Sequence, residues 1–296
     1  MVRWKRWIVA FGLVFYVGIV HADTYYSIDY PGAAGTVLRS INNLNEITGF
    51  YVDGNQNWHA FLLKDGTFYE IGVPNSTFDV ADAINDFDQI VGYYLDDRNI
   101  TTKFSQIFFN GHSGLSHGFL INNGLLTSID FPKARETAAH GINNFMDIVG
   151  RWWDKNTPEH HAFLLRNGTF NSIDCPDTSS TDAWGINNAD DIVGDCAVGG
   201  MLHSFLFSGG VFTFFDPPNS TLSAARGIND HGEIVGLYFD NAGVVHGFRL
   251  MNGKFHTIDP FHSTDTRPQG INSAGDIVGR WTDADGVWHG FLLKRE

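Results

Sequence analysis

One three-part motif returns six times along this chain. Each copy opens with an Ile-Asn pair, continues with an apolar segment that ends in Gly, and closes with a His-small-Phe triplet. Successive Ile-Asn pairs are 43, 58, 44, 42 and 43 residues apart. A period of this length indicates a solenoid or a propeller built from one recurring supersecondary unit. The pairs begin at Ile41, Ile84, Ile142, Ile186, Ile228 and Ile271.

Each unit predicts four short β-strands. Dipeptides such as Asn123-Gly124 and Asn167-Gly168 accept the positive φ angles of tight hairpins, and apolar-rich segments flank them. The strand after the turn often ends in Ile-Asp, as at Ile129-Asp130. Helix-period stripes and capping boxes are absent, which favours strands over a helical repeat. Four strands in each unit match a propeller blade.

The two ends of the repeat array complement each other. The sixth unit stops at Phe291-Leu292-Leu293, before its fourth strand, while Tyr25–Asp29 reads as a fourth strand without a unit. A ring closed by pairing residues 24–29 with residues 288–293 leaves no unpaired seam. We therefore predict an all-β, six-bladed β-propeller over residues 23–296. Its blades cover about 37–73, 80–131, 138–175, 182–216, 224–259, and 267–293 plus 24–29.

The first 22 residues predict a signal peptide. A basic start is followed by the apolar stretch Trp7–Val20, and Val20-His21-Ala22 suits a signal peptidase. The alternative is an uncleaved anchor, but a membrane span needs about 20 apolar residues. We expect export to the periplasm or the cell exterior, with no membrane attachment after cleavage. Cleavage would change the net charge from -14 to -17, which argues against a nucleic-acid partner.

The recurring Ile-Asn, Ile-Val-Gly, and His-Gly-Phe-Leu or His-Ala-Phe-Leu segments resemble the HAF-type probable extracellular repeats of bacteria. The resemblance covers roughly residues 25 to 293, and six copies in phase make it specific. It implies export and a repeat fold, and it brings no established activity or catalytic residue. Unit four departs most. In its segment Gly194-Asp195-Cys196, a Cys stands two positions after the Gly, where the other units have an aromatic residue.

Repeated polar residues have structural interpretations. In five units an Asp follows the repeated Gly by four positions, and we expect it to hydrogen-bond the His that opens the next strand. Zinc needs three or four converging ligands, whereas these His residues are spread over six units. The acidic turn at residues 283–286 lacks the calcium loop pattern. We therefore expect neither a metal nor another cofactor, and we assign no catalytic residue.

The two cysteines predict a disulfide. Cys196 stands where five other units have Tyr or Trp, and Cys175 follows an Ile-Asp ending, where Tyr30 and Phe131 stand in other units. Both positions fall in neighbouring units, and an exported protein meets an oxidising compartment. The alternative is two separate buried thiols.

The informative positions are those at which the repeats differ. The position two residues before each Ile varies in chemical type, although the surrounding motif is rigid. It is either a solvated channel wall or a ligand pocket at the channel mouth. Arg and Trp here suit an anionic or sugar-like ligand. The six residues are Arg39, Asp82, His140, Trp184, Arg226 and Gln269.

Two functions remain open. We favour a monomeric binding module for an oligosaccharide or another cell-envelope partner, because it needs no catalytic constellation. The alternative is a carbohydrate-active lyase or hydrolase, for which Asp82, His140 and Arg226 could supply acid–base groups. Hydrolysis would favour paired carboxylates, and only Asp82 stands at the six positions. The extra segment at about 99–116, which holds Phe108, predicts a lid on the same face.

Overall fold

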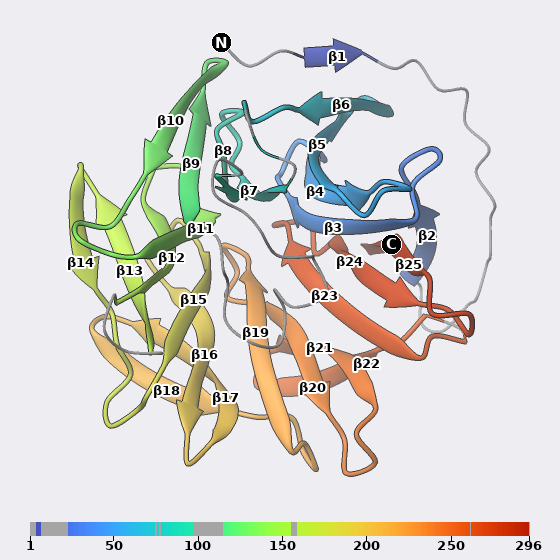
Figure 1. Cartoon of the computed structure of the whole chain (residues 1–296). Helices are drawn as coiled ribbons and strands as arrows, with labels where there is room; N and C mark the ends of the chain where they lie inside the picture. The colour runs from blue at the N-terminus through green and yellow to red at the C-terminus, as the bar shows by residue number, and fades with distance from the viewer. Residues whose placement is uncertain are drawn as a thin grey trace.

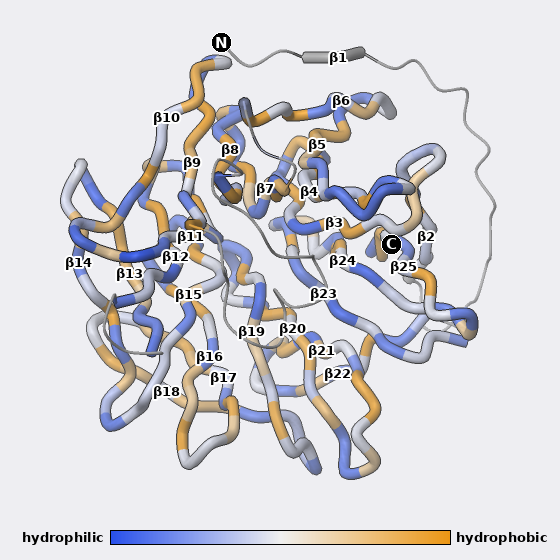
Figure 2. Tube along the Cα trace, viewed as in Figure 1, coloured by the Kyte–Doolittle hydropathy of each residue, from blue (hydrophilic) through white to orange (hydrophobic). Residues whose placement is uncertain are grey.

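The computed structural model describes residues 4–6, 23–74, 76, 78–96, 115–154, 159–260 and 262–295. Within these ranges the chain is all-β, with its sheets arranged side by side around a centre (Figure 1). Apolar and polar residues alternate along many of the strands (Figure 2). No helix long and apolar enough to cross a membrane occurs in the described part of the chain.

Four of the five sheets each contain one complete repeat unit. The first holds β1 (Trp4–Arg6), β3 (Gly35–Ile41), β4 (Ile47–Val52), β5 (Trp58–Lys64) and β6 (Thr67–Ile71). The second holds β7 (Asp79–Ile84), β8 (Ile90–Leu95), β9 (Ser116–Asn122) and β10 (Leu125–Ile129). The third holds β11 (Glu136–Ile142), β12 (Ile148–Trp153), β13 (His160–Arg166) and β14 (Thr169–Ser172). The fourth holds β15 (Thr181–Ile186), β16 (Ile192–Val198), β17 (Met201–Ser208) and β18 (Val211–Phe215).

The fifth sheet has eight strands and contains two repeat units. Unit five comprises β19 (Leu222–Ile228), β20 (Ile234–Phe239), β21 (Val245–Met251) and β22 (Lys254–Ile258). Unit six comprises β23 (Asp265–Ile271), β24 (Ile277–Thr282), β25 (Trp288–Arg295) and the N-terminal β2 (Asp23–Ile28). A single parallel pair, Val245 with Asp265, joins the two halves. The sequence predicts six separate sheets, and this bridge reduces the number to five.

The N-terminal strand pairs with the last strand of the chain. The register of β2 and β25 runs from Asp23 opposite Arg295 to Ile28 opposite Gly290, which is the pairing expected from the split repeat. An unexpected strand, β1, pairs with β6 and falls within the predicted signal peptide. Residues 1–3 and 7–22, the rest of that segment, lie outside the described residues, as do 99–114 of the predicted lid.

The repeated Gly leaves space for the ring of the repeated Phe in the same unit. A Cβ atom added at Gly150 would lie 2.0 Å from the carbonyl oxygen of Ala138 and 2.9 Å from the Phe163 ring. Glycine therefore allows the ring to pack directly over the second strand of the unit, at the density of a protein interior. The equivalent phenylalanines are all fully buried: Phe61, Phe119, Phe163, Phe205, Phe248 and Phe291.

The Asn of each Ile-Asn pair connects neighbouring units. The side-chain oxygen of Asn143 accepts hydrogen bonds from the backbone N–H groups of Phe145 and Asp147, both at 3.0 Å. Its Nδ2 donates to the carbonyl oxygen of Asn187 in the next unit, at 3.2 Å. The same unit-to-unit bond joins Asn42 to Asn85, Asn85 to Asn143, Asn187 to Asn229, Asn229 to Asn272 and Asn272 to Asn42.

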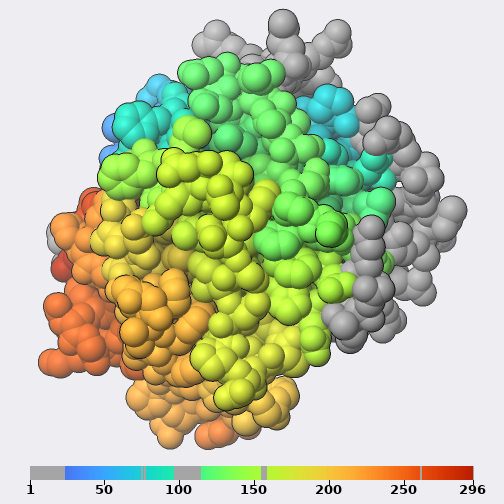
Figure 3. Space-filling model, turned by 90° about the vertical axis from the view of Figure 1, so that its left-hand side faces the viewer, coloured from blue at the N-terminus to red at the C-terminus, as the bar shows by residue number. Residues whose placement is uncertain are grey.

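The predicted disulfide is confirmed. Cys175 and Cys196 are bonded to each other and are buried between units three and four, which lie against each other in the side view (Figure 3). At the equivalent place in two other junctions, two aromatic rings stack. Phe131 and Trp152 lie 4.3 Å apart between their ring centroids. The disulfide thus replaces an aromatic stack with a covalent bond.

The predicted His–Asp contact forms in units one, five and six, and a second Asp, which the sequence analysis did not anticipate, joins it in units five and six. The Nε2 atom of His289 lies 3.3 Å from Asp283, as expected. Its Nδ1 atom lies 2.9 Å from Asp29, the residue that follows β2. His246 makes the same two contacts, with Asp240 and Asp259. The Ile-Asp endings are therefore the second anchor for these His side chains.

Candidate functional site

A β-bulge places each of the six variable residues. In unit one, Leu38 pairs with Gly49 and Ser40 with Thr48, so Arg39 between them has no partner on β4. A bulge of this kind leaves one residue out of the ladder and re-aims its side chain. The same shift occurs in all six units, at Arg39, Asp82, His140, Trp184, Arg226 and Gln269.

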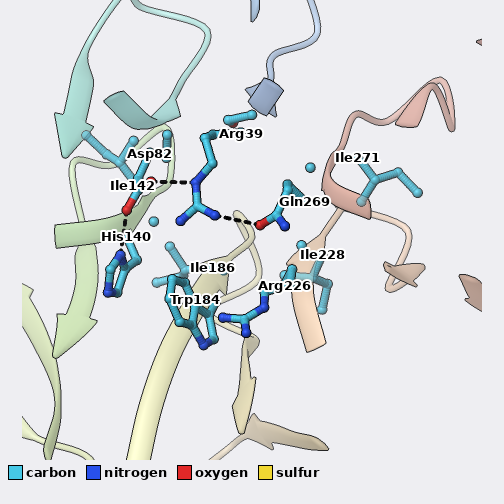
Figure 4. Close-up of a pocket in the computed structure, with 16 residues that line it drawn as sticks. Arg39, Asp82, His140, Ile142, Trp184, Ile186, Arg226, Ile228, Gln269 and Ile271 are labelled. Carbon is cyan, nitrogen blue, oxygen red and sulfur yellow. Dashed lines mark hydrogen bonds and ion pairs between the residues drawn. The ribbon is translucent and has the colours of Figure 1, made fainter. Parts of the chain in front are cut away.

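All six side chains line one cavity at the centre of the molecule (Figure 4). We call it the arginine chamber; its volume is about 70 Å³. A second cavity of about 90 Å³ is lined by the Asn residues of the Ile-Asn pairs. Ile142, Ile186, Ile228 and Ile271 border both cavities and so lie between them. Pockets that enclose drug-sized ligands measure about 300–1,000 Å³, so the arginine chamber admits only a small group of a larger ligand.

The chamber is narrow because small residues bring the inner strands together. A Cβ atom added at Gly185 would lie 3.0 Å from the carbonyl oxygen of Arg226 in the next unit. Gly141, Gly227 and Gly270 face the following inner strand at similar distances. Each of these glycines directly follows a bulged residue. The bulge points the large side chain inward, and the glycine after it lets the neighbouring inner strands lie close together.

Asp82 joins Arg39 to His140 through its two carboxylate oxygens. Its Oδ1 accepts a hydrogen bond from Nε of Arg39 at 2.6 Å, and its Oδ2 lies 2.6 Å from Nδ1 of His140. Nη1 of Arg39 also donates to Oε1 of Gln269, at 2.8 Å. Burial alone would raise the pKa of Asp82, but the charge of Arg39 and the hydrogen bond to His140 outweigh burial and lower it. Asp82 is therefore an anion held between two donors.

His140 is neutral and keeps one ring nitrogen unused. Burial lowers its pKa to about 4, although Asp82 acts in the opposite direction. Because Nδ1 donates its proton to Asp82, Nε2 carries a lone pair. This Nε2 atom is buried and has no hydrogen-bond partner among the described residues. It can accept a hydrogen bond from a hydroxyl group or a water molecule.

Trp184 lies between His140 and Arg226 (Figure 4). The imidazole stacks on the indole with 4.1 Å between centroids, and the guanidinium carbon of Arg226 lies 3.8 Å from the indole centroid. The indole Nε1 donates to Oδ2 of Asp195 at 2.8 Å. Trp184 is therefore held on its faces and its edge, so it is a rigid wall of the chamber.

The sequence analysis missed a second tier of charged residues behind the chamber. Nη1 of Arg151 donates to Oδ2 of Asp182 at 3.3 Å, and the Arg151 guanidinium carbon lies 5.4 Å from the Trp184 centroid. Asp195 lies beside Trp184 and Arg226. Arg151 and Asp195 directly follow the repeated Gly, where the six units also differ in residue type. A search for positions at which the six units differ, which identified the bulged residues, would therefore also have identified Arg151 and Asp195.

Asp195, Arg226 and Asp182 also have shifted pKa values. Burial raises the pKa of Asp195 to about 6, and the charge of Arg226 only partly opposes this. Burial also lowers the pKa of Arg226 to about 10, with nearby Arg39 adding to the effect. By contrast, burial of Asp182 is outweighed by the Arg151 charge and the hydrogen bond from His160 together, so the pKa of Asp182 is lowered. Within the described ranges, no group of three or more His, Cys, Asp or Glu side chains could hold a metal ion.

The comparisons with known proteins identify the fold through solved structures. No protein-family model matches the chain. No curated protein matches it either. TolB from Acinetobacter baumannii aligns with a TM-score of 0.58 at 11% identity, over 90% of this chain and 65% of that one. The chain has the fold of the β-propellers.

Two further structures align over most of their length. A catalytically inactive virginiamycin B lyase from Staphylococcus aureus with quinupristin aligns with a TM-score of 0.51 at 11% identity, over 92% of this chain and 99% of that one. An Aleuria aurantia lectin mutant in complex with Fucalpha1-6GlcNAc aligns with a TM-score of 0.53 at 10% identity, over 88% and 91%. At such identities the likeness concerns the backbone fold alone.

Proposed function

We propose that this chain is an exported HAF-type repeat protein that folds as a closed six-bladed propeller and binds an oligosaccharide at the mouth of the arginine chamber. The convergence of six chemically different bulged side chains on one cavity carries the proposal. The pairing of β2 with β25 and the bond from Asn272 to Asn42 support the closed ring. The disulfide fits an oxidising compartment.

The chemistry of the chamber suits a sugar. Arg39 and Arg226 supply donors, Nε2 of His140 supplies an acceptor, and Trp184 supplies an apolar wall. The cavity is too small for a whole sugar ring, so one substituent of the ligand enters it while the rest lies at the mouth. Buried polar atoms without partners are rare in folded proteins and call for a ligand or an ordered water. His140 and Arg226 both carry such atoms.

A glycan array followed by titration calorimetry tests this function. Replacing Arg226 and Trp184 with Ala should abolish binding of any glycan that the wild-type chain retains. The matched control is Arg135→Ala with Phe214→Ala, which also removes one Arg and one aromatic ring but lies outside the chamber. Binding that survives in the first double variant, with both proteins folded by circular dichroism, would overturn the proposal.

One observation favours an enzyme as the second candidate. Asp82 orients His140 through Nδ1 and leaves Nε2 with a free lone pair, which is the arrangement of a general base. Arg39 contacts the same carboxylate, whereas Arg226 stacks on Trp184 instead. A proton-abstracting lyase fits these groups better than a hydrolase. Incubation with acidic polysaccharides should then give unsaturated products, and His140→Gln should stop their formation.

A further inference from the structure

The arginine chamber and the second tier behind it together have more cations than hydrogen-bonded counterions. The guanidinium carbons of Arg39, Arg151 and Arg226 all lie within 5.5 Å of the Trp184 ring centroid. Three positive charges around one indole ring are unusual in a protein whose formal net charge is -14. Each buried cation needs an anionic partner or hydrogen-bond acceptors to offset the loss of water.

Two of the three arginines have such a partner. Arg39 donates to Asp82 at 2.6 Å, and Arg151 donates to Asp182 at 3.3 Å. Asp195 is the carboxylate beside Arg226, but its Oδ2 lies 3.9 Å from Nη1, beyond hydrogen-bond distance. The same Oδ2 accepts its hydrogen bond from Trp184 instead. Arg226 is therefore the cation of the chamber without a hydrogen-bonded counterion.

Two donor atoms of Arg226 also lack hydrogen-bond partners. Its Nε and Nη1 are buried and have no partner among the described residues. Guanidinium N–H groups form their strongest hydrogen bonds with carboxylates and phosphates. Nε2 of His140, on the other side of Trp184, needs a donor rather than an acceptor. A ligand that carries a carboxylate and hydroxyl groups on one ring supplies both requirements.

We infer that the chamber receives the carboxylate of an acidic sugar at Arg226, and that Asp195 competes with this carboxylate for the arginine. The inference rests on the proposed function and narrows its ligand from oligosaccharides in general to uronic acids. A carboxylate fits a cavity of about 70 Å³, whereas a sugar ring does not. A neutral sugar would offer the unpartnered Arg226 donors no anionic acceptor.

The competition makes binding depend on pH. Asp195 on β16 faces Asp182 and Trp184 of β15, Arg226 of β19 and Arg151 of β12. Its pKa of about 6 means that it loses its charge as the solution becomes mildly acidic. Asp182 remains ionised there and His140, with a pKa of about 4, remains neutral. The affinity for a carboxylate ligand should therefore rise as the pH falls through about 6.

Titration calorimetry of the full chain with D-glucuronate tests the inference, with D-glucose as the neutral counterpart. We expect glucuronate to bind and to bind about tenfold more tightly at pH 5 than at pH 8, which corresponds to one unit of affinity on a logarithmic scale. Asp195→Asn should give the tighter affinity at both pH values. Arg226→Gln should abolish binding, whereas Arg135→Gln should not change it.

A further control addresses His160, which lies 2.7 Å from Asp182 and belongs to the same charged cluster. His160→Gln should leave the pH dependence intact. A pH dependence that persists in Asp195→Asn, or equal binding of glucuronate and glucose, overturns the inference while the proposed glycan function stands. Binding of glucuronate and of acetate alike, with no longer glycan retained, contradicts the glycan function but supports the anion site. Absence of binding by every probe at both pH values overturns both.

Discussion

The side chain of Asn272 donates a hydrogen bond to the carbonyl oxygen of Asn42, 230 positions earlier in the chain. The five other bonds of this series join consecutive units, so this one returns from the last unit to the first. Ser273 repeats the connection through its backbone N–H, which donates to Oδ1 of Asn43 at 2.9 Å. The two ends of the repeat array are therefore hydrogen-bonded to each other near the centre of the molecule.

Loss of one of these Asn side chains should destabilise the fold. In Asn143→Ala the backbone N–H groups of Phe145 and Asp147 lose their acceptor, and the link to Asn187 disappears. An unsatisfied buried polar group costs about 1–3 kcal/mol, so we expect a loss of at least about 2 kcal/mol in urea denaturation. The control Asn171→Ala, on the exposed strand β14, should change little. Equal midpoints for the two variants would refute this role.

Removal of β2 should destabilise the chain more than the loss of a chain terminus normally does. Deleting residues 23–28 leaves one edge of β25 unpaired along six residues. We expect the free energy of unfolding to fall by more than about 4 kcal/mol, the range of severe structural lesions. A synthetic peptide of residues 23–30, added in trans, should restore stability, and a scrambled peptide should not. The pairing is unimportant if the truncated chain unfolds like the intact one.

Reduction should weaken the contact between units three and four. The bond between Cys175 and Cys196 spans 21 positions, which corresponds to about 3 kcal/mol in the chain-entropy description. Cys175→Ala with Cys196→Ala should lose a comparable amount in chemical denaturation. Thiol labelling of the unfolded, unreduced chain provides the direct check: no label should enter before a reductant is added.

A methyl group at Gly150 should prevent correct packing of unit three. The added Cβ would overlap the carbonyl oxygen of Ala138 and the ring of Phe163. We expect Gly150→Ala to lose more than about 4 kcal/mol or to fail to fold. Gly54→Ala, where no atom lies within 4 Å of the added Cβ, is the matched control. Expression and thermal unfolding of the two variants should differ sharply.

His140 and Asp195 should make opposing contributions to the pH dependence of stability. His140 titrates near 4 when folded and near 6.5 when unfolded, so between these values the unfolded chain binds more protons and stability falls as the pH decreases. Asp195 titrates near 6 when folded and near 3.8 when unfolded, so its contribution has the opposite sign. Each slope is at most about 1.4 kcal/mol per pH unit.

Urea denaturation between about pH 4.5 and 7.5 separates the two contributions. His140→Gln should make stability less sensitive to acid, because it removes the group that resists protonation in the fold. Asp195→Asn should make stability more sensitive to acid, because it removes the compensating group. Parallel pH profiles for both variants and the wild-type chain would contradict these assignments.

The repeat pattern predicted the strands and the pairing of the two termini because those features follow from spacing alone. It also predicted that Arg39, Asp82, His140, Trp184, Arg226 and Gln269 share one place in successive units, and the structure brings all six to one cavity. Whether they bind a ligand stays a prediction. The β-bulge that turns them inward has no signature in the residue pattern.

Other features depended on contacts that are distant in sequence. Asp29 and His289 lie 260 positions apart, so their hydrogen bond appears only when the last unit receives its outer strand. Asp195 attracted notice only as a departure from the repeat, because its importance depends on the ring of Trp184 and the charge of Arg226. The lid predicted around Phe108 lies outside the described residues and stays a prediction.

The bulges have a consequence for how such a protein can change. A residue that is excluded from strand pairing contributes little to the backbone ladder, so its identity can be exchanged while the scaffold remains intact. Six such positions surround one small space, and each comes from a different copy of the same motif. A library randomised at these six codons alone would sample new recognition chemistries on a constant framework. Divergence among natural descendants of this scaffold should likewise concentrate there, so that ligand preference evolves separately from folding.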